Sequence, residues 1–255
     1  MNKRQFLERT FAGISTLALA GCDRLNASPW FNKLLSAGEA LSESAHRLTA
    51  RVTMAQEFSK ADLTIPFRAN GSVNPSDTEY RALAPDNFAQ WSLMVDGLVE
   101  QPAAYTLAQL RAMPSRTQIT RHDCVEGWSS IGQWKGVQLS HVLAQVRPLA
   151  NAKYVVFRCA DSMDGPALDG RDSRYYESVD LDDANHVQTV LAYELNGQPL
   201  PVSNGAPLRV RIERQLGYKH AKYVMRIELV ESFATLRGGG GGYWEDNGYE
   251  WYAGI

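Results

Sequence analysis

The 255-residue sequence predicts an α+β fold built around one large domain. Runs in which apolar and polar residues alternate, as at residues 91–95, predict short strands, and the apolar spacing of residues 139–146 predicts a helix between strands. The composition is 44% hydrophobic, which is enough for one substantial core. No internal repeat is visible, so a repeat architecture is not expected.

Residues 1–22 have the organisation of an export signal. Basic Lys3, Arg4 and Arg9 precede an apolar run, Phe11 to Gly21, that is shorter than the roughly 20 apolar residues needed to cross a bilayer. The run ends at Cys22 in the sequence LAGC, which resembles a bacterial lipobox and predicts a lipid-anchored periplasmic protein. A cleavage site beside an unrelated cysteine is the alternative. Residues 3–7, KRQFL, resemble a twin-arginine signal except at Lys3, so the export route stays open.

Residues 23–64 are expected to form an amphipathic helical linker, because Leu34, Leu35, Leu41 and Leu48 recur among polar residues. The helix is expected to pack on the main domain or to link it to the membrane. The main domain is expected to span residues 65–255. It opens with a long segment to residue 87 that is rich in Pro, Asn, Asp and Ser, and is therefore predicted to be irregular.

Local signals predict the elements of the main domain. A strand that includes Trp91 runs into an Asp96-Gly97 turn, which is typical of a hairpin. Thr106 and Gln109 form a capping-box pattern for a short helix, and Ser140 is the candidate N-cap of the helix over residues 139–146. Further strands are expected at residues 154–159 and around Val210, Ile212, Val224, Ile227 and Leu229.

The five glycines Gly238 to Gly242 are typical of a flexible linker. The segment that follows, residues 243–252, is too aromatic for a free tail and is expected to fold back as a strap that buries several rings. Packing alone is one interpretation of this strap. A role beside the functional site or at a partner surface is the other.

A net charge of −2 and a pI of about 6.2 give no basic field for a polyanion, so no nucleic-acid partner is expected. Cys124 has no cysteine within 30 residues and sits in the run RHDCVEGWS at residues 121–129. A lone thiolate in such a run suits a soft metal ion. Collinear segments follow it: Trp134 and Gly136, then NAKYVVF at 151–157, LAYELNG at 191–197, NGAPLR at 204–209 and LGYKHAK at 216–222.

These segments, from about residue 65 to 231, resemble the sulfite-oxidase-fold molybdopterin oxidoreductases, and in particular the periplasmic methionine-sulfoxide reductases. The resemblance implies a molybdopterin-binding domain of mixed β-sheets and short helices, with Cys124 as the protein ligand of molybdenum in a Mo-molybdopterin cofactor. It implies oxygen-atom transfer on a small substrate, with sulfur compounds as candidates. No haem-attachment or iron–sulfur spacing is present, so a separate redox partner, such as a cytochrome or a membrane haem subunit, is expected.

Residues that match the cofactor-contacting positions of the family are Asn70, Val73, Asn74, Cys124, Cys159, Asn204, Arg209, His220, Ala221 and Lys222. Arg209 can hold a phosphate through two parallel hydrogen bonds, and Lys222 can place a charge beside it. Cys159 stands where the reductases have a threonine. A loop asparagine that stabilises its own turn is the alternative for Asn70.

Three catalytic residues are expected: Cys124, His122 and Tyr176. Alternation along a strand puts His122 on the same face as Cys124, where it acts as a proton donor or supports the metal site; a core histidine is the alternative. The family's sulfite-binding arginines have local candidates in Arg171 and Arg174, and its active-site tyrosine in Tyr175 or Tyr176. The CAGNRR run of sulfite-oxidising members is replaced by CVEGWS, which argues against sulfite.

Two other functions fit the cysteines alone. One is a cofactor-free binding lipoprotein with a Cys124–Cys159 disulfide, and an oxidising compartment permits that bond. The other is a thiol-redox protein that uses Cys124 directly, although no resolving cysteine lies close to it in sequence.

Overall fold

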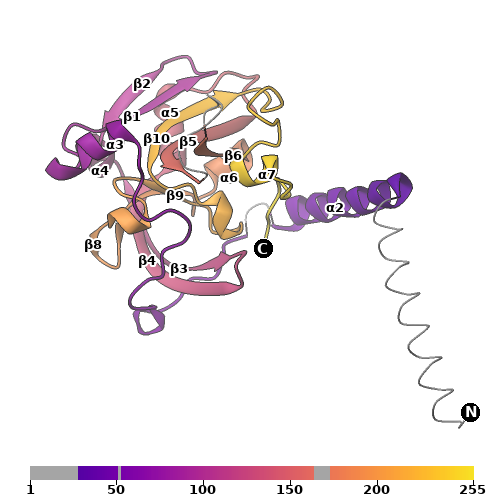
Figure 1. The fold of residues 1–255 in the computed structure, drawn as a ribbon, viewed down its shortest axis with the longest axis horizontal. Coiled ribbons are helices and arrows are strands. Elements are labelled where there is room, and N and C mark those ends of the chain that lie inside the picture. Colours follow the sequence, from indigo (N-terminus) through magenta and orange to yellow (C-terminus); the bar gives the residue numbers. More distant parts are fainter. Residues whose placement is uncertain (1–27, 51–52, 164–172) are drawn as a thin grey trace, which may run out of the picture. The chain divides into compact units, whose positions relative to one another are not determined.

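The computed structural model describes residues 28–50, 53–163 and 173–255 (Figure 1). The chain divides into two compact units, Met1–Arg51 and Val52–Ile255. The described part of the first unit is the helix α2 (Pro29–Ala50), on which Trp30, Leu34 and Leu41 are exposed. None of the described helices is long and apolar enough to cross a membrane. The predicted export signal lies outside the described residues.

The second unit contains two mixed or antiparallel sheets together with short helices, which confirms the predicted α+β class (Figure 1). The first sheet has the order β2-β1-β10-β5-β6 and is antiparallel except for the parallel pair β1 and β10. Its strands are β1 (Ser92–Gly97), β2 (Ala103–Thr106), β5 (Tyr154–Ser162), β6 (Arg174–Asp180) and β10 (Val224–Val230). The predicted hairpin at Asp96-Gly97 is the β1–β2 pair.

The second sheet has the order β3-β4-β7-β8, and β9 also pairs with β7. All of its pairs are antiparallel. Its strands are β3 (Ser115–Cys124), β4 (Trp128–Gln138), β7 (Val190–Leu195), β8 (Gln198–Pro199) and β9 (Arg209–Arg211). Because β9 ends at Arg211, the predicted strand residue Ile212 falls just outside it. The long β3–β4 hairpin lies at the bottom of the view in Figure 1.

Short helices connect the strands. They are α3 (Thr78–Leu83), α4 (Leu107–Ala112), α5 (Leu139–Val146), α6 (Leu181–Asn185) and α7 (Tyr243–Asp246), with 3-10 turns at Lys60–Asp62, Ala84–Asp86, Val202–Asn204 and Gly217–Lys219. The Thr106–Gln109 capping box of α4 is confirmed. The N-cap of α5 is Gln138 and not Ser140, and α3 makes the segment over residues 65–87 less irregular than predicted.

The main core packs the first sheet against its helices. Leu93 and Val95 of β1 and Val155 and Phe157 of β5 are fully buried there. Burial of each such side chain stabilises the fold by roughly 1.5–3 kcal/mol. A smaller cluster on the second sheet contains Phe67, Trp134, Val190, Ala192, Leu195 and Leu200.

The compact unit begins at Val52, before the expected domain boundary at residue 65. Residues on either side of Ser59 bond to the second sheet, since Phe58 N donates to Ile119 O and Thr64 N donates to Ile131 O. This segment therefore extends the domain.

The prediction of a flexible glycine linker is wrong. The backbone N–H groups of Gly238 and Gly240 donate to the Asp246 carboxylate, and Ser178 Oγ donates to Gly241 O. A Cβ on Gly242 would lie 2.0 Å from Glu245 Oε2, so the tract is glycine because the chain passes close to its neighbours. The strap after it folds back over β6, with Trp244 and Trp251 half-buried.

Candidate functional site

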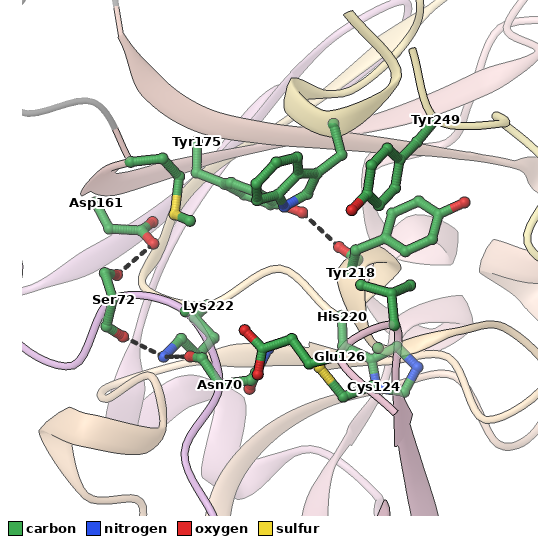
Figure 2. A pocket seen from close by; sticks show the side chains of 15 residues that line it. Asn70, Ser72, Cys124, Glu126, Asp161, Tyr175, Tyr218, His220, Lys222 and Tyr249 are labelled. Carbon is green, nitrogen blue, oxygen red and sulfur yellow. Dashed lines mark hydrogen bonds between the residues drawn. The ribbon is translucent and has the colours of Figure 1, made fainter. Parts of the chain in front are cut away.

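A cleft beside Cys124 encloses about 680 Å³ of space that protein atoms do not fill, part of it open to solvent. Segments distant in sequence meet around it (Figure 2). The lining residues are Asn70, Gly71, Ser72, Cys124, Val125, Glu126, Asp161, Met163, Tyr175, Gly217, Tyr218, His220, Lys222, Trp244 and Tyr249.

Cys124 is at the last position of β3, at the tight turn into β4. Gly127 N donates to Cys124 O at 3.0 Å, and Gly127 has a φ of +82°, a conformation that favours glycine. The turn leaves the thiol half-buried at the cleft. Burial raises the pKa of the Cys124 thiol above its ordinary value. This is the opposite of the lowered pKa that activates redox cysteines, so it argues against the thiol-redox alternative.

The structure has both Cys124 and Cys159 as free thiols, which contradicts the disulfide alternative. Cys159 lies in the main core and is not one of the cleft-lining residues. Burial, followed by the charge of Asp161, raises its pKa well above the ordinary range, so Cys159 is a neutral thiol.

His122 lies behind Cys124 and is fully buried. Its Nδ1 is 2.9 Å from the Arg211 guanidinium, a permanent donor, so Nδ1 is the acceptor and the proton sits on Nε2. Burial, followed by the Arg211 charge, lowers the pKa of His122 well below its ordinary value. The structure therefore has a neutral ring packed beside His220, with ring centroids 5.2 Å apart, and does not place His122 on the cleft wall.

Lys222 and Asn70 meet on one side of the cleft (Figure 2). Lys222 Nζ donates to the backbone carbonyls of Asn70, Ser72 and Ser203. Burial, followed by the charge of Arg209, lowers the pKa of Lys222 to about 7. Asp161 is also buried, accepts a hydrogen bond from Ser72 Oγ at 2.6 Å, and has a raised pKa because of its burial.

Arg209 lies deeper, in β9, and is fully buried. Its guanidinium donates to the carbonyls of Asn204 and His220, and it stacks 4.9 Å from the Trp134 ring centroid. Its neighbour Arg211 lies over the same ring and pairs with Glu213 at 2.6 Å. Burial, followed by the Arg211 charge, lowers the pKa of Arg209 to about 9. A buried cation held by neutral carbonyls is suited to an anion such as a phosphate.

Buried polar atoms in and behind the cleft lack hydrogen-bond partners among the described residues. Those on lining residues are Asn70 Oδ1, Asp161 Oδ1 and His220 Nδ1, and those deeper in the protein are Asn204 Nδ2 and Arg209 Nε. Each buried unsatisfied group costs about 1–3 kcal/mol. Their donor and acceptor mixture fits a polar, anionic organic cofactor, and Cys124 at the same cleft can supply a thiolate to its metal. The residues present therefore fit a molybdopterin.

Other expected site residues lie away from the cleft. Val73 and Asn74 are exposed, and Ala221 is buried outside the lining. The Tyr176 hydroxyl donates to Asp246 at 2.6 Å, so it fastens the strap, while adjacent Tyr175 lines the cleft. Arg174 lies 3.8 Å from Asp77, and Arg171 falls outside the described residues.

Sequence reasoning missed the aromatic side of the cleft. Tyr218, Trp244 and Tyr249 line it together with Tyr175 and Met163. Figure 2 shows Tyr175, Tyr218 and Tyr249 opposite Cys124, Asn70 and Lys222. The aromatic density of residues 243–252 was the available signal. It could not show which of those rings face the cleft.

Comparison with known proteins places this arrangement in a family. Residues 81–235 match the family model described as the oxidoreductase molybdopterin binding domain. The chain belongs to this family of molybdopterin-binding oxidoreductases. The predicted enzyme class, its molybdopterin cofactor and its oxygen-atom transfer chemistry are therefore confirmed at the level of the family.

Two relatives are similar over most of their length. The chain is 36% identical over 254 residues to YedZ1 of Azospira oryzae, provisionally named a protein-methionine-sulfoxide reductase subunit, covering 99% of this oxidoreductase and 87% of the relative. It is 32% identical over 232 residues to the protein-methionine-sulfoxide reductase catalytic subunit MsrP of Xanthomonas campestris, covering 89% and 70% of the two chains.

The fold resembles the sulfane dehydrogenase SoxCD from Paracoccus pantotrophus, with a TM-score of 0.51 and 22% identity over 59% of this chain and 40% of that chain. Together with the family match, this likeness confirms the predicted sulfite-oxidase-like fold of the oxidoreductase.

Proposed function

We propose that this oxidoreductase is the catalytic subunit of an exported enzyme that reduces methionine sulfoxide in proteins. Two relatives carry names of this activity. The observation that carries the proposal is the cleft itself. Its side opposite Cys124 is aromatic, and among the lining residues, all of which are described, Lys222 is the one cation.

We assign that lysine, which donates to carbonyls of Asn70, Ser72 and Ser203, to the anionic part of the cofactor, so no cation among the lining residues is left for an anionic substrate. Sulfite is an anion, whereas a sulfoxide is neutral, with a polar S–O group and apolar substituents. An uncharged aromatic wall opposite the proposed metal ligand therefore favours a sulfoxide.

We assign the site residues as follows. Cys124 holds the metal, and Arg209 and Lys222 hold the anionic part of the cofactor, while Asn70, Asn204 and His220 satisfy its polar edges. When bound, the molybdenum cofactor supplies two-electron oxygen-atom transfer chemistry. His122 keeps a neutral ring behind Cys124, where it excludes water and fixes the β3–β4 turn.

The overall reaction consumes two electrons and two protons for each sulfoxide, releases the oxygen as water and leaves a thioether. A separate redox subunit would supply the electrons. The relatives named as a subunit and as a catalytic subunit support such a partner. The partner's chemistry, a haem protein, is our expectation from the lack of haem-attachment and iron–sulfur motifs in this sequence.

The cellular location rests on the first 22 residues. We propose export to the periplasm, followed by lipid attachment at Cys22 in LAGC. Replacing Cys22 with Ser should move the protein from the membrane fraction to the soluble periplasmic fraction. Equal membrane association of both forms would count against the lipid anchor.

The function is tested with molybdenum-loaded enzyme and a reduced viologen dye as electron donor. Dye oxidation is measured with N-acetyl-methionine sulfoxide amide and with an oxidised, unfolded protein, and sulfite is offered with ferricyanide as acceptor. We expect turnover on both sulfoxides and little sulfite oxidation. Fast sulfite oxidation without sulfoxide reduction would overturn the proposal.

A further inference from the structure

We infer that residues 243–249 of the strap are the specificity element of this site, with Trp244 and Tyr249 as the wall that receives the methionyl side chain of the substrate. This inference rests on the proposed function and assigns the recognition of its substrate to particular residues. Glu245 and Asp246, between Trp244 and Tyr249 in the sequence, act by holding these two rings in place.

The two rings form one continuous surface with Tyr218. Trp244 and Tyr249 are stacked with centroids 5.1 Å apart and an interplanar angle of 27°, and Tyr249 N donates to Trp244 O. Tyr218 and Tyr249 form a T-shaped pair with centroids 5.4 Å apart, and the Tyr218 hydroxyl donates to Glu250 O at 2.6 Å. All three side chains line the cleft, and Figure 2 shows Tyr218 and Tyr249 turned toward one another across its upper side.

The wall is fixed from behind by charged groups. Lys219 Nζ is fully buried between Glu177 and Glu245, at 2.6 and 2.5 Å. Asp246, the next residue, accepts hydrogen bonds from Tyr176 Oη and from the backbone of Gly238 and Gly240. Because Glu245 and Asp246 directly follow Trp244, their contacts set the position of the indole. They are positioning residues.

The chemistry of the wall matches a methionyl side chain. A thioether or sulfoxide with its methyl and methylene groups packs favourably on aromatic faces, because sulfur is polarisable and the chain is flexible. Met163 lines the same cleft and shows that this environment already accommodates such a side chain. The rim stays open for a polypeptide, since Tyr249 is 40% exposed and Val125, beside Cys124, is 43% exposed. The partner that fits is a flexible protein segment carrying an oxidised methionine.

The test compares two substrates of different reach on the loaded enzyme. Dimethyl sulfoxide carries the reacting group alone, whereas N-acetyl-methionine sulfoxide amide also carries the chain that would contact the wall. Tyr249→Ala and Trp244→Leu should raise KM for the methionyl substrate about tenfold, a usual effect of losing apolar contacts in a pocket. Turnover of dimethyl sulfoxide and molybdenum content should change less than about twofold.

Trp251→Phe is the matched control. Trp251 belongs to the same strap but stacks on Phe233, with centroids 5.4 Å apart, and is not a cleft-lining residue. It should leave both substrates unaffected. Asp246→Asn, which weakens the contact to Tyr176, should raise KM for the methionyl substrate without changing kcat.

The outcomes separate this inference from the proposed function. A parent enzyme that reduces neither sulfoxide contradicts the proposed function. If the parent reduces both sulfoxides, the specificity role of the wall is overturned when Tyr249→Ala and Trp244→Leu impair the reduction of both substrates equally, or of neither. Loss of molybdenum in these two variants would assign the strap to cofactor binding and also overturn it.

Discussion

Lys222 shows how a single buried charge couples the site to the stability of the cofactor-free protein. Its ammonium group is held by neutral carbonyls, and burial together with the Arg209 charge lowers its pKa to about 7. An unfolded lysine has a pKa of about 10.4. Between these two values the unfolded chain binds more protons than the folded chain. The free energy of unfolding therefore rises with pH in this window, by up to about 1.4 kcal/mol per pH unit.

Replacing Lys222 with Met should flatten this dependence. In the cofactor-free parent, urea denaturation should show stability rising between about pH 7 and pH 10, because the folding penalty of the ammonium group disappears as the unfolded lysine also loses its proton. The methionine variant lacks that penalty at every pH. Lys135→Met, at a side chain that is 41% exposed, serves as the control and should keep the slope of the parent. An unchanged slope in Lys222→Met would refute the assignment of this pH dependence to Lys222.

Cys124 gives a second residue-scale prediction. Cys124→Ser should lower sulfoxide turnover by more than about 100-fold, because a hydroxyl is a poor replacement for a soft thiolate. The melting temperature of the cofactor-free protein should change little, since the side chain is half-buried at the end of a strand. Cys159→Thr is the control and should retain both activity and molybdenum. Parent-like turnover by the serine variant would remove the central residue of the proposed site.

Residue-scale prediction from the sequence named four site residues that the structure brings together around one cleft. Cys124, Asn70, His220 and Lys222 all line the cleft. It gave the catalytic role to Tyr176, whereas Tyr175 lines the cleft, because alternation along β6 puts consecutive side chains on opposite faces without showing which face meets the cleft. Only the packing of the strap, which takes the Tyr176 hydroxyl, distinguishes the two.

Among the elements, β4 is constrained on both edges, since it pairs with β3 on one edge and β7 on the other. Its register with β7 shifts between Lys135 and Gly136. A Cβ on Gly136 would lie 2.2 Å from Leu191 O, a backbone atom that cannot move without separating the strands. The pairing of β4 with β7 therefore requires glycine at position 136.

Gly136→Ala should destabilise the protein by about 3 kcal/mol, at the upper end of ordinary overpacking costs. The measurement is urea denaturation followed by circular dichroism. Gly132→Ala, also in β4, meets side-chain atoms of Phe67 at 2.9 Å, and a ring can shift more easily than a backbone. Gly132→Ala should therefore lower the free energy of unfolding by clearly less than Gly136→Ala does. Equal losses for the two variants would show that the β4–β7 contact is not the limiting one.

Elements that local signals determine were predicted from the sequence, as the capping box of α4 and the β1–β2 hairpin show. The predictions were wrong where contacts with residues elsewhere in the sequence determine the local structure. The helix α5 begins after Gln138 because Leu139 N donates to Thr189 O beside β7, which fixes the entry of the chain. The glycine tract is ordered because Asp246, later in sequence, accepts its N–H groups. The composition of these segments predicts neither contact.

Across the whole molecule, the cleft joins segments that are far apart in sequence, from Asn70 to Tyr249. The family resemblance, which ends near residue 231, pointed to the polar side and to Cys124 as the proposed metal ligand. Half of the aromatic side, Trp244 and Tyr249, comes from residues beyond it. Both halves depend on the same fold, but the polar half contains buried groups that have no hydrogen-bond partner in the described part of the chain, so its stability depends on what binds there.

This dependence predicts a large difference between cofactor-loaded and cofactor-free protein. A ligand present at about 1,000 times its Kd stabilises a protein by about 4 kcal/mol, which corresponds to roughly 10 °C in melting temperature for a domain of this size. Calorimetry of protein made in cofactor-producing and cofactor-deficient hosts measures it. Arg209→Ala should shrink the difference, because it removes a buried cation assigned to the cofactor and relieves the free protein of an unsatisfied Nε. Identical melting of loaded and free parent protein would show that the buried polar groups do not contact the cofactor.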